Sequence, residues 1–140
     1  MGRQSELCAP GSGGGAGHTD VHEQVLLNVY DVMEDGRLAF VNKLLRPMGV
    51  GAYHAAVEVY GLEWSFGHRK GYGSGVFSCR PRENSCVGKF REAVPLGQTT
   101  LSSQDVAAHL ALLELEWPGE AYDVIGQNCI HFCEALLHAL

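Results

Sequence analysis

Two segments of the sequence hold residue types that could act together as a nucleophile and its base. His54 lies in Gly51-Ala-Tyr-His-Ala-Ala-Val-Glu58, at the head of an expected β-strand. Cys129 lies in Gly126-Gln-Asn-Cys-Ile-His131, at the expected start of a helix. A thiol with an imidazole beside it is the usual reactive pair of cysteine hydrolases. The pair therefore predicts acyl transfer through a covalent intermediate.

Each of these two residues also has a purely structural interpretation. Asn128 is a good N-cap, so Cys129 would sit where unpaired backbone N–H groups and the helix dipole stabilise a thiolate and could bind an oxyanion. Cys129 is also the first member of an apolar helical stripe, and cysteine is among the most buried residue types. A lone histidine on the polar face of a strand, like His54, is more often a surface or hydrogen-bonded residue. Neither residue alone decides between catalysis and packing.

No third catalytic residue or metal site follows from the spacing. Glu58 shares the expected strand face of His54, but four residues of strand span about 13 Å, which is too far to hold the imidazole directly. Any third member must therefore come from another strand. His131 lies about 200° around the helix from Cys129, so Cys-x-His-x-Cys cannot converge on one metal ion. We expect a site without a metal or other cofactor.

The elements that would position the pair form a small antiparallel sheet followed by two helices. Strands are expected over residues 25–31, 53–60, 62–67, 76–79 and 89–96, with Gly61 turning a hairpin and a helical turn at 41–45. One helix begins at the capping-box-like Ser102-Ser-Gln-Asp105 and ends before Pro118. Apolar residues at helical spacing predict the other from Cys129 to Leu140. This pattern indicates an α+β domain.

Length and composition fit one domain, residues 25–140, after a flexible Gly-rich tail over residues 1–24. The net charge of −6 and the absence of a basic block argue against nucleic-acid binding. No apolar run approaches the roughly 20 residues of a transmembrane segment. An odd set of five cysteines without a signal peptide indicates a cytoplasmic or nuclear protein.

Four segments of the chain together resemble the PPPDE family, the permuted papain-fold peptidases that include the desumoylating isopeptidases. They follow one another in the family's order within residues 25–140. The segments are Leu27-Asn-Val-Tyr-Asp31, Gly51-Ala-Tyr-His-Ala-Ala-Val-Glu-Val-Tyr-Gly-Leu-Glu-Trp-Ser-Phe-Gly67, Glu92-Ala-Val-Pro-Leu-Gly97 and Ala121-Tyr-Asp-Val-Ile-Gly-Gln-Asn-Cys-Ile-His-Phe132.

The resemblance implies a permuted papain-like cysteine peptidase fold with the nucleophile at a helix N-terminus. His54 would be the base and Cys129 the nucleophile, in the reverse of papain's chain order. The implied reaction is cleavage of the isopeptide bond between SUMO or ubiquitin and a substrate lysine. Some relatives are credited with hydrolysing the thioesters of palmitoylated proteins, so a protein S-depalmitoylase with the same dyad is the first alternative.

Two departures from the family pattern leave a third interpretation open. The residue after the cysteine is commonly Asn, and here it is Ile130. The family domain also continues into a segment with a Pro-Trp-like stretch, whereas this chain stops at Leu140, so we expect a C-terminally shortened domain or an incomplete substrate groove. A non-catalytic module that binds ubiquitin-like proteins is therefore the second alternative. A homodimer is compatible with the sequence, which shows no self-complementary patch.

Overall fold

A computed structural model describes residues 22–32, 53–83 and 87–140 of the chain. The expected helical turn at 41–45 and nearly all of the expected Gly-rich tail lie outside these residues. The described elements are β1 (Glu23–Val32), β2 (Tyr53–Val59), β3 (Leu62–Phe66), β4 (Val76–Cys79), β5 (Gly88–Thr99), α2 (Ser103–Glu116), the 3₁₀ helix η2 (Gly119–Ala121) and α3 (Cys129–Ala139). They form a small antiparallel sheet with two α-helices, which confirms the expected α+β class.

The strands of the described part form one sheet in the order β4-β3-β2-β1-β5, with every neighbouring pair antiparallel. β5 is longer than expected and pairs with β1 along its whole length. Two irregularities in the register, between Val25 and Leu26 and between Val29 and Tyr30, let these long strands stay paired while they bend. β2, which carries His54, lies at the centre of the sheet.

The β2–β3 connection is the two-residue hairpin loop expected at Gly61. Tyr60 and Gly61 both have positive φ, at 51° and 71°, as a type I′ turn requires. Tyr60 tolerates this unusual conformation with two anchors: its amide donates to Glu23 Oε1 at 3.2 Å, and its hydroxyl donates to Leu101 O at 2.7 Å. The tight turn fixes the register of β3 against β2.

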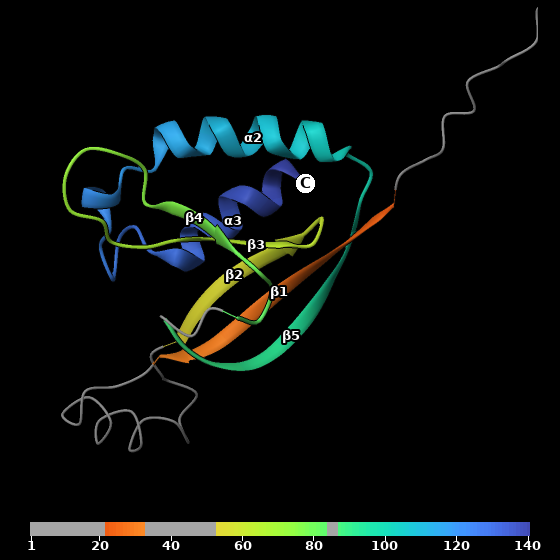
Figure 1. Cartoon of the computed structure of the whole chain (residues 1–140), viewed down its shortest axis with the longest axis horizontal. Helices are drawn as coiled ribbons and strands as arrows, with labels where there is room; N and C mark the ends of the chain where they lie inside the picture. The colour runs from red at the N-terminus through yellow and green to blue at the C-terminus, as the bar shows by residue number, and fades with distance from the viewer. Residues whose placement is uncertain (1–21, 33–52, 84–86) are drawn as a thin grey trace, which may run out of the picture.

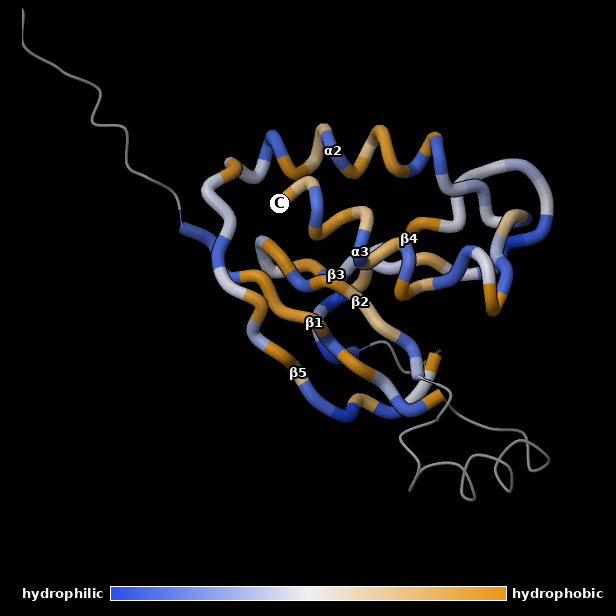
Figure 2. The backbone as a smooth tube through the Cα atoms, turned by 180° about the vertical axis from the view of Figure 1, so that it is seen from behind, coloured by the Kyte–Doolittle hydropathy of each residue, from blue (hydrophilic) through white to orange (hydrophobic). Residues whose placement is uncertain are grey.

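The two α-helices lie on one face of the sheet, and α3 runs between α2 and the strands (Figure 1). α2 has the predicted capping box, in which Ser102 and Asp105 hydrogen-bond to each other's backbone amides. Hydrophobic and hydrophilic residues alternate around its turns (Figure 2), and only the side facing α3 is buried. The core residues between helices and sheet are Val25, Ala55, Val57, Val59, Phe66, Val106, Leu110, Phe132, Cys133 and Leu136.

The segment that leads from α2 to Cys129 is tied by backbone hydrogen bonds to the loop between β3 and β4. Gly75 N donates to Trp117 O at 2.9 Å, Gly119 N donates to Gly73 O at 2.9 Å, and Arg69 N donates to Gly119 O at 3.1 Å. A side chain on Gly119 would meet the Cβ of Arg69, so this close approach requires glycine.

Within the residues that the structure describes, no helix is both long and apolar enough to cross a membrane.

Candidate active site

Cys129 is the first residue of α3, as the N-cap signal of Asn128 predicts. The Oδ1 atom of Asn128 accepts hydrogen bonds from the amides of Ile130 and His131, at 3.0 and 3.3 Å. In return, Nδ1 of His131 accepts the amide of Asn128 at 3.2 Å. This reciprocal cap fixes the backbone on both sides of Cys129.

The thiol of Cys129 is held against β2. The residue is 3% exposed, and the backbone amide of Ala55 is close enough to its sulfur to lower the pKa of the thiol. Burial raises the pKa of the thiol, while the amides of Ala55, Ile130 and Cys129 itself act in the opposite direction. The amides at the helix start thus favour the thiolate as expected, but desolvation outweighs them.

His54 lies in β2 directly before Ala55 and is 7% exposed, so it is not the surface residue that the alternation pattern allowed. Its ring stacks on Phe77 with 6.2 Å between centroids and 16° between planes, and Tyr30 packs beside it at 6.1 Å. Nε2 lies 3.0 Å from Ser65 Oγ. Burial lowers the pKa of His54 to about 4, against an opposing effect of the negative charge on Glu63.

Cys129 therefore lies against β2 at the residue that follows His54. The amide that acts on the sulfur belongs to Ala55, the residue that follows His54, although Cys129 and His54 come from distant parts of the chain. Backbone pairing between β2 and β3 runs from the hairpin only as far as Val57 and Trp64. Beyond that point Ser65 Oγ donates to Ala55 O at 2.7 Å, so a side chain replaces a backbone hydrogen bond between the two strands. The N–H of Ala55 is therefore available to the sulfur.

A buried polar cluster lies on the side of the sheet that carries His54. Glu63, almost completely buried, accepts the hydroxyl of Tyr30 on both carboxylate oxygens, at 2.8 and 2.7 Å. Oε2 also accepts Asn28 Nδ2 at 2.8 Å and the amide of Arg82 at 3.1 Å. Glu58, predicted to be too far to orient His54, hydrogen-bonds to Asn28 instead. The cluster keeps the carboxylate of Glu63 near the imidazole of His54, and its charge acts on the ring without a hydrogen bond between them.

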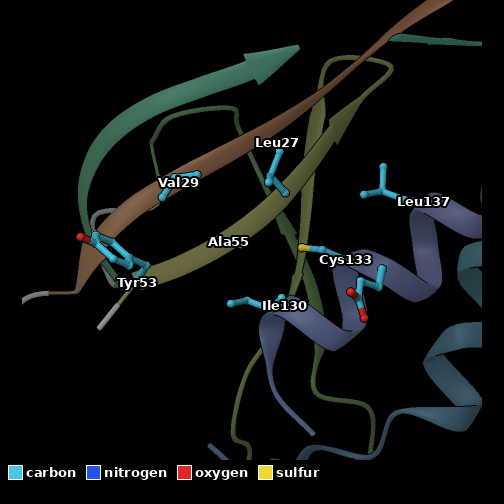
Figure 3. Close-up of a pocket in the computed structure, with 8 residues that line it drawn as sticks. Leu27, Val29, Tyr53, Ala55, Ile130, Cys133 and Leu137 are labelled. Carbon is cyan, nitrogen blue, oxygen red and sulfur yellow. The ribbon is translucent and has the colours of Figure 1, made fainter. Parts of the chain in front are cut away.

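An apolar cavity of about 410 Å³ opens beside the start of α3, between that helix and strands β1 and β2. Figure 3 shows side chains of all three elements turned toward it, with Ile130 at one side. Ala55 belongs to its wall, so the cavity adjoins the residue whose amide lowers the pKa of Cys129. The lining residues are Leu27, Val29, Tyr53, Ala55, Ile130, Cys133, Glu134 and Leu137.

The part of the chain that the structure describes contains no group of three or more His, Cys, Asp or Glu side chains that could hold a metal ion. His131, the middle residue of Cys-x-His-x-Cys, caps α3 instead.

Three contributions to the site escaped the sequence analysis. Ser65 carries no motif, and only its place in β3 opposite the head of β2 could have indicated contact with His54. The capping role of His131 could have been inferred from the Asn-x-x-His spacing, which resembles a capping box. Glu63 has no local signal, because its partners come from β1 and from the turn after β4.

Comparison with known proteins matches residues 23–140 to the family described as "PPPDE putative peptidase domain". A DeSI-like protein of Arabidopsis thaliana is 37% identical over 111 residues, which is 79% of this chain and 46% of that protein. The "Desumoylating isopeptidase 1 homolog" of Caenorhabditis elegans is 33% identical over 119 residues, 83% of this chain and 34% of that protein. The "DeSI-like protein sdu1" of Schizosaccharomyces pombe is 37% identical over 113 residues, which is 80% of this chain and 55% of that protein. The chain thus spans about half or less of each relative.

Proposed function

This chain belongs to the PPPDE peptidase family, and we propose that it is a cysteine isopeptidase that releases a ubiquitin-like modifier from a substrate lysine. One observation carries the proposal: Cys129, the first residue of α3, lies next to the backbone amide of Ala55, the residue that follows His54. Cys129 is the nucleophile and His54 its base. In this proposal the chain has a permuted papain fold, in which the histidine comes before the cysteine.

The reaction begins from a neutral pair, because burial lowers the pKa of His54 and raises that of Cys129. His54 takes the thiol proton as the sulfur attacks the isopeptide carbonyl carbon. The protonated imidazole then gives this proton to the departing lysine amine, and the modifier stays on Cys129 as a thioester. Water, deprotonated by His54, attacks the thioester, and the modifier leaves with a free carboxylate while the thiol is restored.

The start of α3 supplies the donor for the oxyanion of each tetrahedral intermediate. The amides of Ile130 and His131 are committed to Asn128 Oδ1. The amide of Cys129 lies at the positive end of the helix dipole, where negative charge is stabilised. No metal ion or cofactor is needed for these steps.

The proposed substrates are SUMO-conjugated proteins, because one relative is named a desumoylating isopeptidase. Ubiquitin conjugates are the other candidates, since either modifier offers the same type of bond. A reactive thiol needs a reducing compartment, so we place the activity in the cytoplasm or nucleus. The proposal requires neither a nucleic acid nor a second copy of the chain.

The apolar cavity favours a second candidate function, the hydrolysis of thioesters on S-acylated proteins. Its volume of about 410 Å³ and its apolar lining suit a hydrocarbon chain. Its wall includes both Ala55, whose amide acts on Cys129, and Ile130, the residue after Cys129 in α3. An acyl chain in this cavity would have its thioester end beside Cys129.

Electrophilic probes test the isopeptidase proposal. SUMO and ubiquitin that end in a propargylamide are incubated with the protein, and covalent adducts are measured by mass spectrometry. We expect an adduct on Cys129 with at least one modifier, none with Cys129→Ser, and little with His54→Gln. Cys133→Ala is the matched control, because it removes a buried thiol of the same helix, and its adduct should form normally. Equal labelling of Cys129→Ser and the wild type would overturn the proposal.

A fluorogenic acyl thioester separates the candidate functions. Leu27→Trp fills the cavity, whereas Leu112→Trp adds the same ring to an exposed position of α2. If hydrolysis of S-acyl thioesters is the function, Leu27→Trp should abolish this activity and Leu112→Trp should not. If neither substrate is processed and Cys129 resists iodoacetamide, the chain is a binding module instead.

A further inference from the structure

Ser65 is the side chain whose hydroxyl lies within hydrogen-bond distance of the imidazole of His54. It lies in β3, is 1% exposed, and its Oγ has two partners: the carbonyl oxygen of Ala55 at 2.7 Å and His54 Nε2 at 3.0 Å. The other polar group near the ring, Glu63, has its oxygens occupied by Tyr30, Asn28 and the amide of Arg82.

Counting protons at Ser65 determines which nitrogen of His54 carries hydrogen. The carbonyl of Ala55 can only accept, so at 2.7 Å the single hydroxyl proton of Ser65 must point to it. Oγ can then only accept from the imidazole. Nε2 must therefore be the protonated nitrogen, and Nδ1 of the neutral ring keeps its lone pair.

The ring cannot exchange these positions without losing the contact. Rotating the imidazole by half a turn would bring Cε1, which is no donor of comparable strength, opposite Ser65 Oγ. Phe77 stacks on the ring and Tyr30 packs beside it. These two aromatic rings hold the plane of the imidazole, and the hydrogen bond with Ser65 selects its orientation and tautomer.

We propose that Ser65 is the positioning residue of the catalytic pair, holding His54 as the Nε2–H tautomer so that Nδ1 is the base for Cys129. This inference rests on the proposed function. With Nε2 engaged by Ser65, Nδ1 is the ring nitrogen whose lone pair is left for the thiol, and the amide that acts on the sulfur belongs to the next residue, Ala55. Ser65 also fixes the other end of Ala55 by hydrogen-bonding its carbonyl. The hydroxyl of Ser65 thereby positions both the imidazole of His54 and the backbone of Ala55, whose amide acts on Cys129.

The tautomer can be read directly by long-range proton–nitrogen NMR of the imidazole at about pH 7. In the wild type we expect protonated Nε2 and unprotonated Nδ1. Ser65→Ala removes the acceptor, so the two tautomers of His54 should become mixed. Ser65→Thr keeps a hydroxyl and should retain the wild-type spectrum. Ser78→Ala is the matched control, because it makes the same change at an exposed position of the neighbouring strand β4.

Kinetics of modifier release provide the second readout. Ser65→Ala should lower kcat about 10- to 100-fold with little change in KM, because it leaves a buried donor unpaired and misaligns the base. Ser65→Thr should restore most of kcat, and Ser78→Ala should match the wild type. A wild-type His54 protonated on Nδ1, or Ser65→Ala with unchanged kcat and tautomer, would overturn the positioning role and leave the isopeptidase proposal intact. The expected spectra in a protein without hydrolytic activity would support the tautomer assignment and overturn the proposed function.

Discussion

Asn128 and His131 cap each other across the first turn of α3. Asn128 Oδ1 binds the amide of His131, and Nδ1 of His131 binds the amide of Asn128. Cys129 lies between them, so the local structure that presents the proposed nucleophile depends on a neutral imidazole acceptor as well as on the N-cap itself.

Removing this cap should affect the thiol as well as stability. We expect Asn128→Ala to lower the free energy of unfolding by about 1 kcal/mol, the usual value of an N-cap, and to slow alkylation of Cys129 by iodoacetamide. Ser102→Ala removes the equivalent cap of α2 and should cost a similar amount without changing that alkylation rate. Urea denaturation and a timed alkylation assay measure the two effects. Equal alkylation of both variants would argue that the cap does not position Cys129.

The reactivity of Cys129 should depend on His54 and on pH. His54→Gln removes the base, so we expect alkylation of Cys129 to fall at least tenfold near pH 7. Because burial raises the pKa of the thiol, the wild-type rate should keep rising between about pH 7 and 9. Cys133 is an internal control, since burial and the nearby Cys129 raise its pKa strongly. Peptide mapping by mass spectrometry resolves the two thiols, and a plateau for Cys129 near neutrality would contradict this expectation.

The burial of His54 should make the fold sensitive to acid. The imidazole pKa is about 4 in the folded chain and 6.5 in its ordinary state, so between these values the unfolded chain binds a proton that the folded chain does not. The free energy of unfolding therefore falls as pH decreases from about 6.5 to 4, by about 3 kcal/mol from this residue. His54→Gln, which does not titrate, should lose less stability over this window. Denaturant titrations at several pH values measure the difference, and parallel curves would refute it.

Glu63 should matter more than Glu58 for both stability and His54. Glu63→Gln introduces an amide where three donors converge, so we expect unfolding free energy to fall by about 1–3 kcal/mol. Glu58→Gln should cost under about 1 kcal/mol, because its ion pair with Arg82 is partly exposed. Glu63→Gln should also lower the pKa of His54 further, since the charge of Glu63 raises it. An NMR titration of His54 checks the direction, and similar effects of both variants would count against the distinction.

The sequence predicts the elements well because their signals are local. The capping box at Ser102, the N-cap at Asn128 and the turn at Gly61 each depend on a few neighbouring residues, and all three are found at the predicted positions. The sequence predicts the ends of β5 less well, because the strand extends to Thr99 and the pattern predicts it only to residue 96. Its pairing with β1 depends on partners and bulges that no local pattern encodes.

The environment of the candidate site could not be derived from the sequence in the same way. Alternation puts His54 on a polar strand face, where either a surface or a hydrogen-bonded position is expected. In the structure that face is polar but buried, because Tyr30, Ser65 and Phe77 come from three different strands to cover the imidazole. The pKa of the Cys129 thiol likewise depends on tertiary packing, because desolvation raises it and backbone amides lower it.

The effect of the Ala55 amide on the thiol of Cys129 has a practical consequence for mutagenesis. The donor belongs to the main chain, so replacing the side chain of residue 55 leaves it in place, and alanine scanning of the strand would not detect it. An amide-to-ester replacement at Ala55, introduced by peptide ligation, deletes only this N–H. The contact is also insensitive to the identity of residue 55, so homologous chains could keep it while their sequences diverge at that position.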